Sequence, residues 1–161
     1  MQKLGIIFDT CAAISDRERV LFMQKHGFEA TFLMSNDPAI EERVALLKAS
    51  GITIDNCHAP FDGINCMWYP TTAGDEMLSR LVSGVENCAR YEIPVIIVHV
   101  SSGENPPRVS EVGLARFVTV EKHLKERFPS LAIVGSGMSY YRCGYKARNL
   151  HGFLIETFAC T

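Results

Sequence analysis

The sequence predicts an α/β protein built on a parallel β-sheet, and three observations support this fold class. Short apolar segments alternate with amphipathic helical segments along most of the chain. The connections are short, as in right-handed βαβ crossovers. The length of 161 residues suits one domain with a hydrophobic core. Periodicity alone leaves two architectures open, a doubly wound sheet and a (βα)8 barrel.

The expected elements follow the order βαβαβαβαβ, with one more helix after the last strand. Strands are predicted at residues 4–8, 28–34, 52–58, 94–99 and 131–134. Helices are predicted at residues 16–26, 38–50, 75–91, 111–128 and 149–158. Ser15 and Glu18 form a capping box before the first helix, Asn36 or Asp37 can cap the second, and Ser110 can cap the fourth. These caps are local evidence for helix boundaries that the apolar periodicity leaves approximate.

Composition sets broad limits on the class of protein. The chain is 47% hydrophobic and 21% charged, with a formal net charge of −2, which gives no field that favours nucleic acid or an acidic membrane. The first residues lack a signal-peptide pattern and no apolar run reaches membrane-spanning length, so a cytoplasmic protein with no membrane partner is expected. The six cysteines contain no C-x-x-C pair, which favours free, buried thiols.

Two histidines end the third and fourth predicted strands. His58 stands in the segment Cys-His-Ala-Pro-Phe-Asp-Gly-Ile-Asn of residues 57–65, and His99 in Ile-Ile-Val-His-Val-Ser-Ser-Gly of residues 96–103. Pro60 removes a backbone donor and keeps the residues before it extended, so the strand ends there and a long loop follows. Because parallel strands end at one edge of a sheet, the two imidazoles are predicted to lie together.

These motifs resemble the xylose-isomerase-like TIM-barrel superfamily, over about residues 3–125. The residues that carry the resemblance are Asp9, the His-Ala-Pro-Phe motif at 58–61 with Ile64 and Asn65, and His99 with Ser102 and Gly103. The superfamily contains sugar phosphate isomerases and epimerases and the zinc-dependent apurinic endonucleases. The resemblance selects the (βα)8 barrel, in an incomplete form of about five βα units, with the site at the C-terminal ends of the strands.

The resemblance also implies residue roles. His58 and His99 would be catalytic, lining a sugar pocket in the isomerases or holding a metal such as Mn, Mg or Zn, and no other residue is a metal candidate. Asp9, Phe61 and Trp68 are expected to contact substrate, although Asp9 could equally be a turn former and the aromatic rings could simply bury their loop. Structural roles are expected for the remaining candidates, Cys57, His26, His123 and His151.

The C-terminal part departs from the superfamily. Residues 131–137 carry no carboxylate where metal-dependent members supply a glutamate, and the acids after His123 are Glu126 and Glu156 alone. The metal cage therefore lacks ligands within one chain, and any divalent metal is expected to bind weakly or not at all. We expect a single partial barrel domain over residues 1–161, with an atypical tail at 126–161.

Three functions remain open. The first is a sugar or sugar-phosphate isomerase or epimerase, truncated and weakly active or inactive, whose parent chemistry is metal-assisted proton transfer. The second is a non-catalytic barrel fragment that associates into a homodimer or larger assembly through open sheet edges and uncovered side chains such as Ile7 and Ile97. In the competing arrangement, the tail from Ser136 covers that face in a monomer. The third is a metal-dependent apurinic endonuclease, disfavoured by the charge, so nucleic acid is not expected as a partner.

Overall fold

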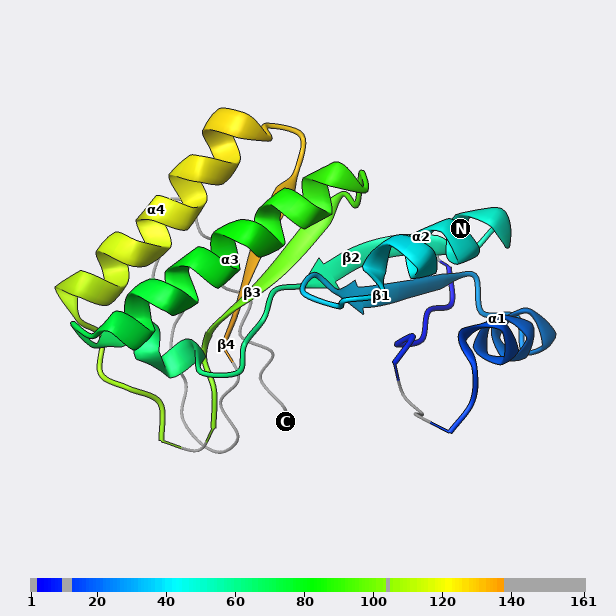
Figure 1. Cartoon of the computed structure of the whole chain (residues 1–161), viewed down its shortest axis with the longest axis horizontal. Helices are drawn as coiled ribbons and strands as arrows, with labels where there is room; N and C mark the ends of the chain where they lie inside the picture. Colours follow the sequence, from blue (N-terminus) through cyan, green and yellow to red (C-terminus); the bar gives the residue numbers. More distant parts are fainter. Residues whose placement is uncertain (1–2, 10–12, 104, 138–161) are drawn as a thin grey trace.

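A computed structural model describes residues 3–9, 13–103 and 105–137 of the chain. The predicted helix at 149–158 and most of the expected tail lie outside this part. The strands are β1 (Ala30–Met34), β2 (Thr53–His58), β3 (Val95–Ser101) and β4 (Ala132–Gly137). The helices are α1 (Asp16–Lys25), α2 (Ile40–Ala49), the short 3-10 helix η1 (Ile64–Trp68), α3 (Thr72–Arg90) and α4 (Glu111–Arg127). The alternation predicted from the sequence is confirmed (Figure 1).

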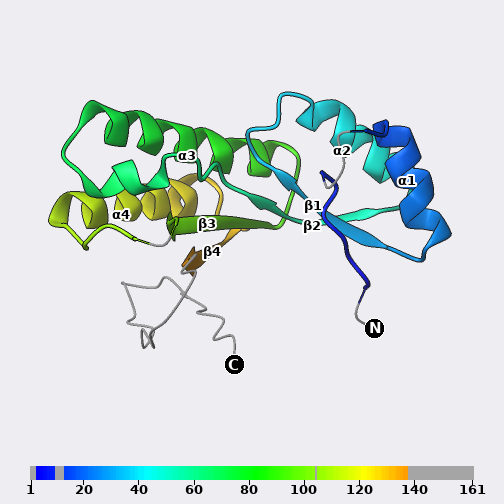
Figure 2. The same ribbon diagram turned by 90° about the horizontal axis from the view of Figure 1, so that it is seen from below.

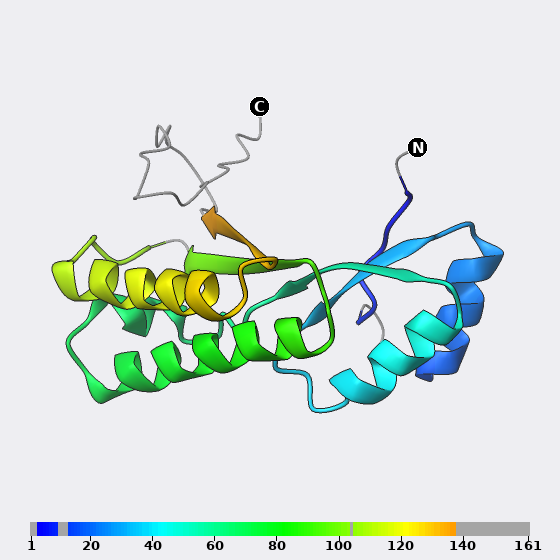
Figure 3. The ribbon, with the colours of Figure 1, turned by 90° about the horizontal axis from the view of Figure 1, so that it is seen from above.

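The strands form a parallel four-stranded sheet in the order β1-β2-β3-β4. Helices α1 to α4 lie on one side of this sheet (Figures 2 and 3). The core between the two layers contains fully buried side chains from both, among them Leu47, Leu81, Ile96, Val98 and Val120. None of the helices in the described part of the chain combines the length and apolar character that crossing a membrane requires.

The predicted first strand is only partly formed. Residues 4–8 run beside β1 and make a single parallel bridge, between Gly5 and Ala30. The Ile6 N–H donates to the Ala30 carbonyl at 3.1 Å, and the Glu29 N–H donates to the Leu4 carbonyl at 2.9 Å. Within the described residues the segment has a strand neighbour on one side only, and Gly5 offers no side chain for packing, which explains the short pairing.

Helix caps account for most of the observed boundaries. The capping box of Ser15 and Glu18 is present, and Ser110 accepts a hydrogen bond from the Gly113 N–H, as expected. Helix α3 begins one turn earlier than predicted because the Thr71 side chain caps it. Helix α2 begins later, at Ile40, because the Asp37 carboxylate accepts from the Ala39 N–H and stabilises a turn before the helix.

The pairing of β1 with β2 contains one irregularity. Thr31 pairs with Ile54 but Phe32 pairs with Asn56, so Asp55 is an extra residue in β2. The extra residue places Ile54 and Cys57, three positions apart, in the buried layer beneath the helices. Because side chains alternate along a strand, His58 then lies on the opposite face from Cys57, on the side of the sheet away from the helices.

Candidate functional site

His58 and His99 lie side by side at the C-terminal ends of β2 and β3. His58 is the last residue of β2 and pairs with Ile97, two residues before His99. Nδ1 of His58 lies 3.2 Å from Nε2 of His99, a hydrogen-bond distance. His99 is only 6% exposed, and His58 is half-buried. The predicted juxtaposition of the two imidazoles is confirmed, whereas their catalytic role is a separate question.

The imidazole of His58 is uncharged at neutral pH. Burial, and to a smaller extent charge repulsion from the neighbouring His99, lower the pKa of His58 to about 4. Between the two imidazoles, a ring nitrogen that carries a proton donates the shared hydrogen bond and an unprotonated ring nitrogen accepts it. Among the described residues, His99 is the hydrogen-bond partner of the His58 ring, and the contact uses Nδ1 of His58.

Two aromatic rings enclose the pair. Phe32 on β1 stacks against His58, with ring centroids 4.7 Å apart. Phe61, in the loop after β2, presents its ring edge-on to His99, with centroids 5.1 Å apart. Phe61 therefore lies beside the histidines, and its contact with a substrate stays a prediction. Phe32 also lies beside them, which was not anticipated from the sequence. An apolar position in an ordinary strand gave no sign of this placement.

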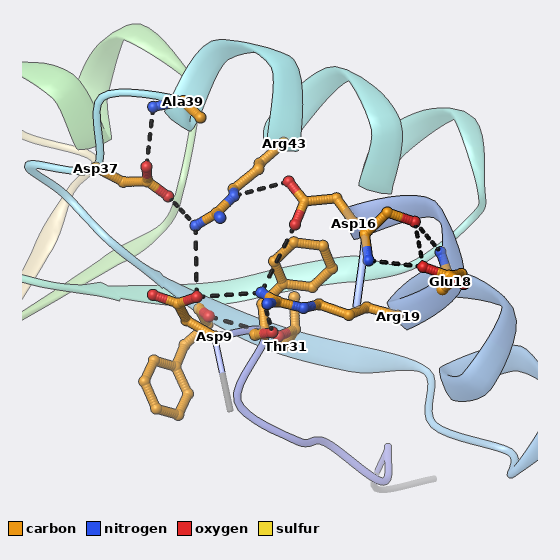
Figure 4. Close-up of polar contacts among 11 residues, drawn as sticks. Asp9, Asp16, Glu18, Arg19, Thr31, Asp37, Ala39 and Arg43 are labelled. Carbon is orange, nitrogen blue, oxygen red and sulfur yellow. Dashed lines mark hydrogen bonds and ion pairs between the residues drawn. The ribbon is translucent and has the colours of Figure 1, made fainter. Parts of the chain in front are cut away.

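Asp9 lies in a separate, charged cluster. Its carboxylate is 54% exposed and accepts from Arg19 Nη1 at 3.1 Å, and Arg43 Nη1 is 3.9 Å away. Arg43 also pairs with Asp16, at 2.9 Å, and with Asp37 (Figure 4). Among the described residues Asp9 makes no hydrogen bond or ion pair to either histidine, so its partners in this structure are arginines.

Phe8 forms the apolar centre of this charged cluster. The guanidinium carbons of Arg19 and Arg43 lie 5.7 and 5.6 Å from the centre of its ring. Both distances are within the range of cation–π attraction, and the ring itself is fully buried. The cluster thus joins the end of the N-terminal segment to α1 and α2, close to the loop that follows β1.

Trp68 ends η1 and lies in the core. The indole N–H donates to the Val100 carbonyl at 2.6 Å, and the ring packs against Phe117 with centroids 5.2 Å apart. Helix α4 approaches so closely that a Cβ on Gly113 would lie 2.2 Å from the Trp68 ring. The substrate contact predicted for Trp68 stays a prediction. In this structure the indole N–H is hydrogen-bonded to the Val100 carbonyl in β3.

Arg116 on α4 organises the same segment and was missed by sequence reasoning. Its buried guanidinium donates to the carbonyls of Met67 at 3.0 Å, Tyr69 at 2.6 Å and Thr71 at 3.2 Å, and it pairs with Asp75 at 2.6 Å. A Cβ on Gly74 would collide with it at 2.2 Å. These bonds fix the chain between η1 and α3 from the side opposite to β3.

The residues expected to be structural are placed as follows. Cys57 is fully buried, as predicted, and its hydrogen bond to Cys88, together with burial, raises the pKa of Cys88. His26 is the C-cap of α1. His123 has an acidic neighbour that sequence spacing did not reveal, since its Nε2 lies 3.3 Å from Glu86 on α3. His151 lies outside the described residues.

The described donors do not fit a divalent metal centre. A structural or catalytic site uses at least three protein ligands, and no group of three His, Cys, Asp or Glu side chains in the described part of the chain could hold an ion. The two histidines hydrogen-bond to each other, and Asp9 pairs with arginines. What the arrangement offers chemically is a pair of hydrogen-bonding imidazoles beside two aromatic rings, with the ring of His58 uncharged at neutral pH.

Solved structures share this fold. A 3-keto-D-glucoside 4-epimerase from E. coli superposes with a TM-score of 0.64 and 16% sequence identity, over 84% of this chain and 56% of that one. A D-psicose 3-epimerase from Clostridium cellulolyticum, solved with D-tagatose, gives 0.63 and 12%, over 84% and 52%. Endonuclease IV from Thermus thermophilus gives 0.56 and 15%, over 84% and 51%. No protein-family model and no curated protein sequence matches the chain.

The similarity shows the fold of the xylose-isomerase-like TIM barrels, and the resemblance found in the sequence is confirmed at that level. The chain spans about half the length of these barrels. Its described residues form an incomplete barrel, a parallel sheet with alternating helices on one side.

Proposed function

We propose that the chain is a sugar-binding half barrel of the isomerase and epimerase type, in which His58 and His99 contact a sugar or sugar phosphate. The observation that carries this proposal is the imidazole pair at the C-terminal ends of β2 and β3, in which the ring of His58 is uncharged at neutral pH. Sugars present vicinal hydroxyl groups, which pair well with neighbouring donors and acceptors, and Phe61 offers an apolar surface for C–H groups of a sugar ring.

The pKa of His58 refines its role. A general base works best with a pKa near the working pH, and a group with a pKa of about 4 is a weak base at pH 7. We therefore assign His58 to hydrogen bonding with a hydroxyl or carbonyl oxygen rather than to proton abstraction. The acids that move a proton in a complete isomerase would have to come from outside the described residues.

Titration with D-tagatose, the sugar bound in one of the similar structures, tests the proposal. We expect ligand-induced NMR shifts centred on His58, His99 and Phe61, and at least fivefold weaker binding in His58→Ala and His99→Ala. Asn36→Ala is the matched control, because Asn36 is exposed at the same end of the sheet. Folded wild-type protein that binds neither D-tagatose nor other ketohexoses and their phosphates would overturn the proposal.

Metal analysis tests the conclusion that the described donors do not fit a divalent metal centre. After dialysis we expect zinc, manganese or magnesium at well below one ion per chain, because the described histidines are too few to hold an ion firmly. Stoichiometric metal that falls in both His58→Ala and His99→Ala would show that further ligands complete a metal site. A metal-dependent endonuclease is not favoured, since the net charge of −2 does not attract a phosphate backbone.

A second candidate is a non-catalytic half barrel that pairs with a second copy. Apolar side chains are exposed beside the N-terminal edge of the sheet, including Leu4 at 57% and Phe22 at 47%. A hollow of about 210 Å³ lies between residues 6–8 and α1, lined in part by Ile14 and Phe22. Exposed apolar surface next to an unpaired edge is typical of an association site.

Light scattering at several concentrations tests this candidate. We expect a dimer or larger assembly that Phe22→Glu weakens. Val109→Glu should not weaken it, because Val109 is 69% exposed in the loop before α4, away from α1. A compact mass of one chain at every concentration would refute the dimer and favour coverage by the tail. The cytoplasmic location expected from the sequence stays a prediction.

A further inference from the structure

The short helix η1 is joined to the end of β3 by one asparagine side chain. Nδ2 of Asn65 donates to the Ser102 carbonyl at 2.9 Å, and the Ser102 N–H donates to Oδ1 of Asn65 at 2.9 Å. The primary amide thus satisfies both backbone groups of one residue, as a neighbouring strand would. This pairing links two loops that are far apart in sequence, the loop after β2 and the loop after β3.

Other contacts hold η1 in the same position. The Trp68 indole donates to the Val100 carbonyl at 2.6 Å, two residues before Ser102. On the opposite side, Arg116 donates to the carbonyls of Met67 and Tyr69. The helix is therefore fixed between α4 and β3, and Asn65 is the member of this set that reaches the loop beyond the end of β3.

The asparagine closes a ring of contacts that includes both histidines. Asn65 follows His58 along the chain through residues 59–64, and Ser102 follows His99 through residues 100–101. The ring is completed by the 3.2 Å contact between the two imidazoles. Phe61 is one of residues 59–64, so it belongs to this ring of contacts, and the edge of its aromatic ring faces His99. Movement of the Ser102 loop would therefore move the strand end that carries His99.

Backbone geometry makes the pairing specific to this place. Gly63, directly before η1, has φ +79°, and Gly103, directly after Ser102, has φ +81°. Both values lie in the left-handed region that glycine adopts at little cost. The two turns bring the Asn65 amide and the Ser102 backbone into register, and the primary amide can donate and accept there at once.

We propose that Asn65 is a positioning residue for the histidine pair, holding the loop after β3 so that His99 faces His58 before any ligand binds. The ligand assigned to the pair rests on the proposed sugar-binding function, whereas the positioning itself concerns the protein without ligand. Fixing binding groups in advance avoids the entropic cost of ordering them when the ligand arrives.

NMR of the unliganded protein tests the proposal with two variants. Asn65→Ala removes both hydrogen bonds to Ser102, and Asn65→Asp keeps the acceptor for the Ser102 N–H but loses the donor. Asn36→Ala is the control, an exposed asparagine in the loop after β1. The measurements are exchange of the Ser102 amide proton and the ¹⁵N spectrum of the imidazole nitrogens, which reports tautomer and hydrogen bonding.

In Asn65→Ala we expect Ser102 amide exchange to quicken by about tenfold or more, since two hydrogen bonds are lost and a net contribution of about 1 kcal/mol corresponds to about fivefold for each. We also expect the signals of His58 Nδ1 and His99 Nε2 to move toward those of free, tautomerising imidazoles. Asn65→Asp should largely retain the slow amide exchange and shift the imidazole signals less. The control should change neither.

Faster Ser102 exchange with unchanged imidazole signals would overturn the proposal, because Asn65 would then be a loop stabiliser only. If Asn65→Ala does not fold, Asn65→Asp decides, since unchanged imidazole signals in that variant contradict positioning through the paired amide. Failure of the proposed function gives a different result: D-tagatose would bind to no folded variant, wild type included, while the imidazole signals would still respond to Asn65.

Discussion

Two regions at the same end of the sheet are held by buried or half-buried arginines in different ways. Around Phe8, Arg19 and Arg43 pair with the carboxylates of Asp9, Asp16 and Asp37. Around η1, Arg116 donates mainly to backbone carbonyls, with one carboxylate, that of Asp75, at the edge. The first region is a network of opposite charges, and the second is one cation bound by peptide dipoles.

The difference shows how each region supports its surroundings. Attraction between partly exposed charges is weakened by salt and by protonation of the carboxylates. Hydrogen bonds from one buried guanidinium to carbonyls depend little on salt or on protonation of carboxylates. Removal of the guanidinium, however, leaves several carbonyl acceptors without a donor. The histidine pair is joined to the second region through η1 and Asn65. We therefore expect the site to tolerate salt and to be sensitive to loss of Arg116.

The largest expected effect is that of Arg116→Ala. Removal of the guanidinium leaves the carbonyls of Met67, Tyr69 and Thr71 without their donor, and we expect the free energy of unfolding to fall by about 3–5 kcal/mol. Urea unfolding followed by circular dichroism measures this. Arg90→Ala, at an exposed position on α3, should cost less than about 0.5 kcal/mol. A loss below about 1 kcal/mol for Arg116→Ala would contradict the importance of the carbonyl bonds.

A smaller effect is expected from Arg43→Ala in the charged region. The variant removes the partner of the nearly buried Asp37 carboxylate, so a loss of about 2–3 kcal/mol is expected at low salt. Because salt already weakens the partly exposed pairs, the loss should be smaller at about 1 M NaCl, as measured by urea unfolding in both solutions. Arg17→Ala, an exposed arginine on α1, is the control. Equal losses at both salt concentrations would mean that packing on Phe8 dominates.

The smallest expected effect is the pH dependence due to His58. Its pKa is about 4 in the folded protein and near 6.5 in the unfolded chain, so between these values the unfolded chain binds a proton that the folded protein does not. Its contribution to stability is complete above pH 6.5 and is lost as the pH falls toward 4. Because solvent screens this half-buried side chain, we expect a change of about 1 kcal/mol.

His58→Gln tests this dependence, since glutamine does not titrate. The difference in the free energy of unfolding between wild type and variant should change between about pH 7 and about pH 4.5, in the direction of a relatively less stable wild type at low pH. A constant difference over this range would show that His58 accepts a proton as readily in the folded protein as in the unfolded chain. Direct NMR titration of the imidazole gives the pKa independently.

Much of the fold was predictable because its signals are local. Alternating apolar periodicity gave the order of strands and helices, and the caps at Ser15 and Ser110 lie where short polar side chains precede helical segments. The histidines were found because a strand end marked by Pro60 or Gly103 is a recognisable place in a parallel sheet. The register that brings their rings into contact follows from ordinary β2–β3 pairing.

The remaining features depend on contacts between distant residues. An arginine within an amphipathic helix usually lies on the exposed face, and nothing near Arg116 in sequence indicates carbonyls 45 to 49 positions away. Asn65 bonds to a residue 37 positions away, and Asp9 is directed to arginines by the packing of α1 and α2. The length of the first strand was overestimated because its sequence does not reveal whether a second strand lies on its other side.

The extra residue in β2 has a consequence for how other chains of this fold can be aligned with this one. Since Thr31 pairs with Ile54 and Phe32 with Asn56, a chain that lacked Asp55 could form an uninterrupted ladder with every other partner unchanged. His58 would still face away from the helices, beside the same neighbours. A one-residue gap inside a strand normally counts against an alignment, because it turns every later side chain to the other face. At this position the gap would be neutral, and barrels of the same fold with a strand one residue shorter should be aligned through it.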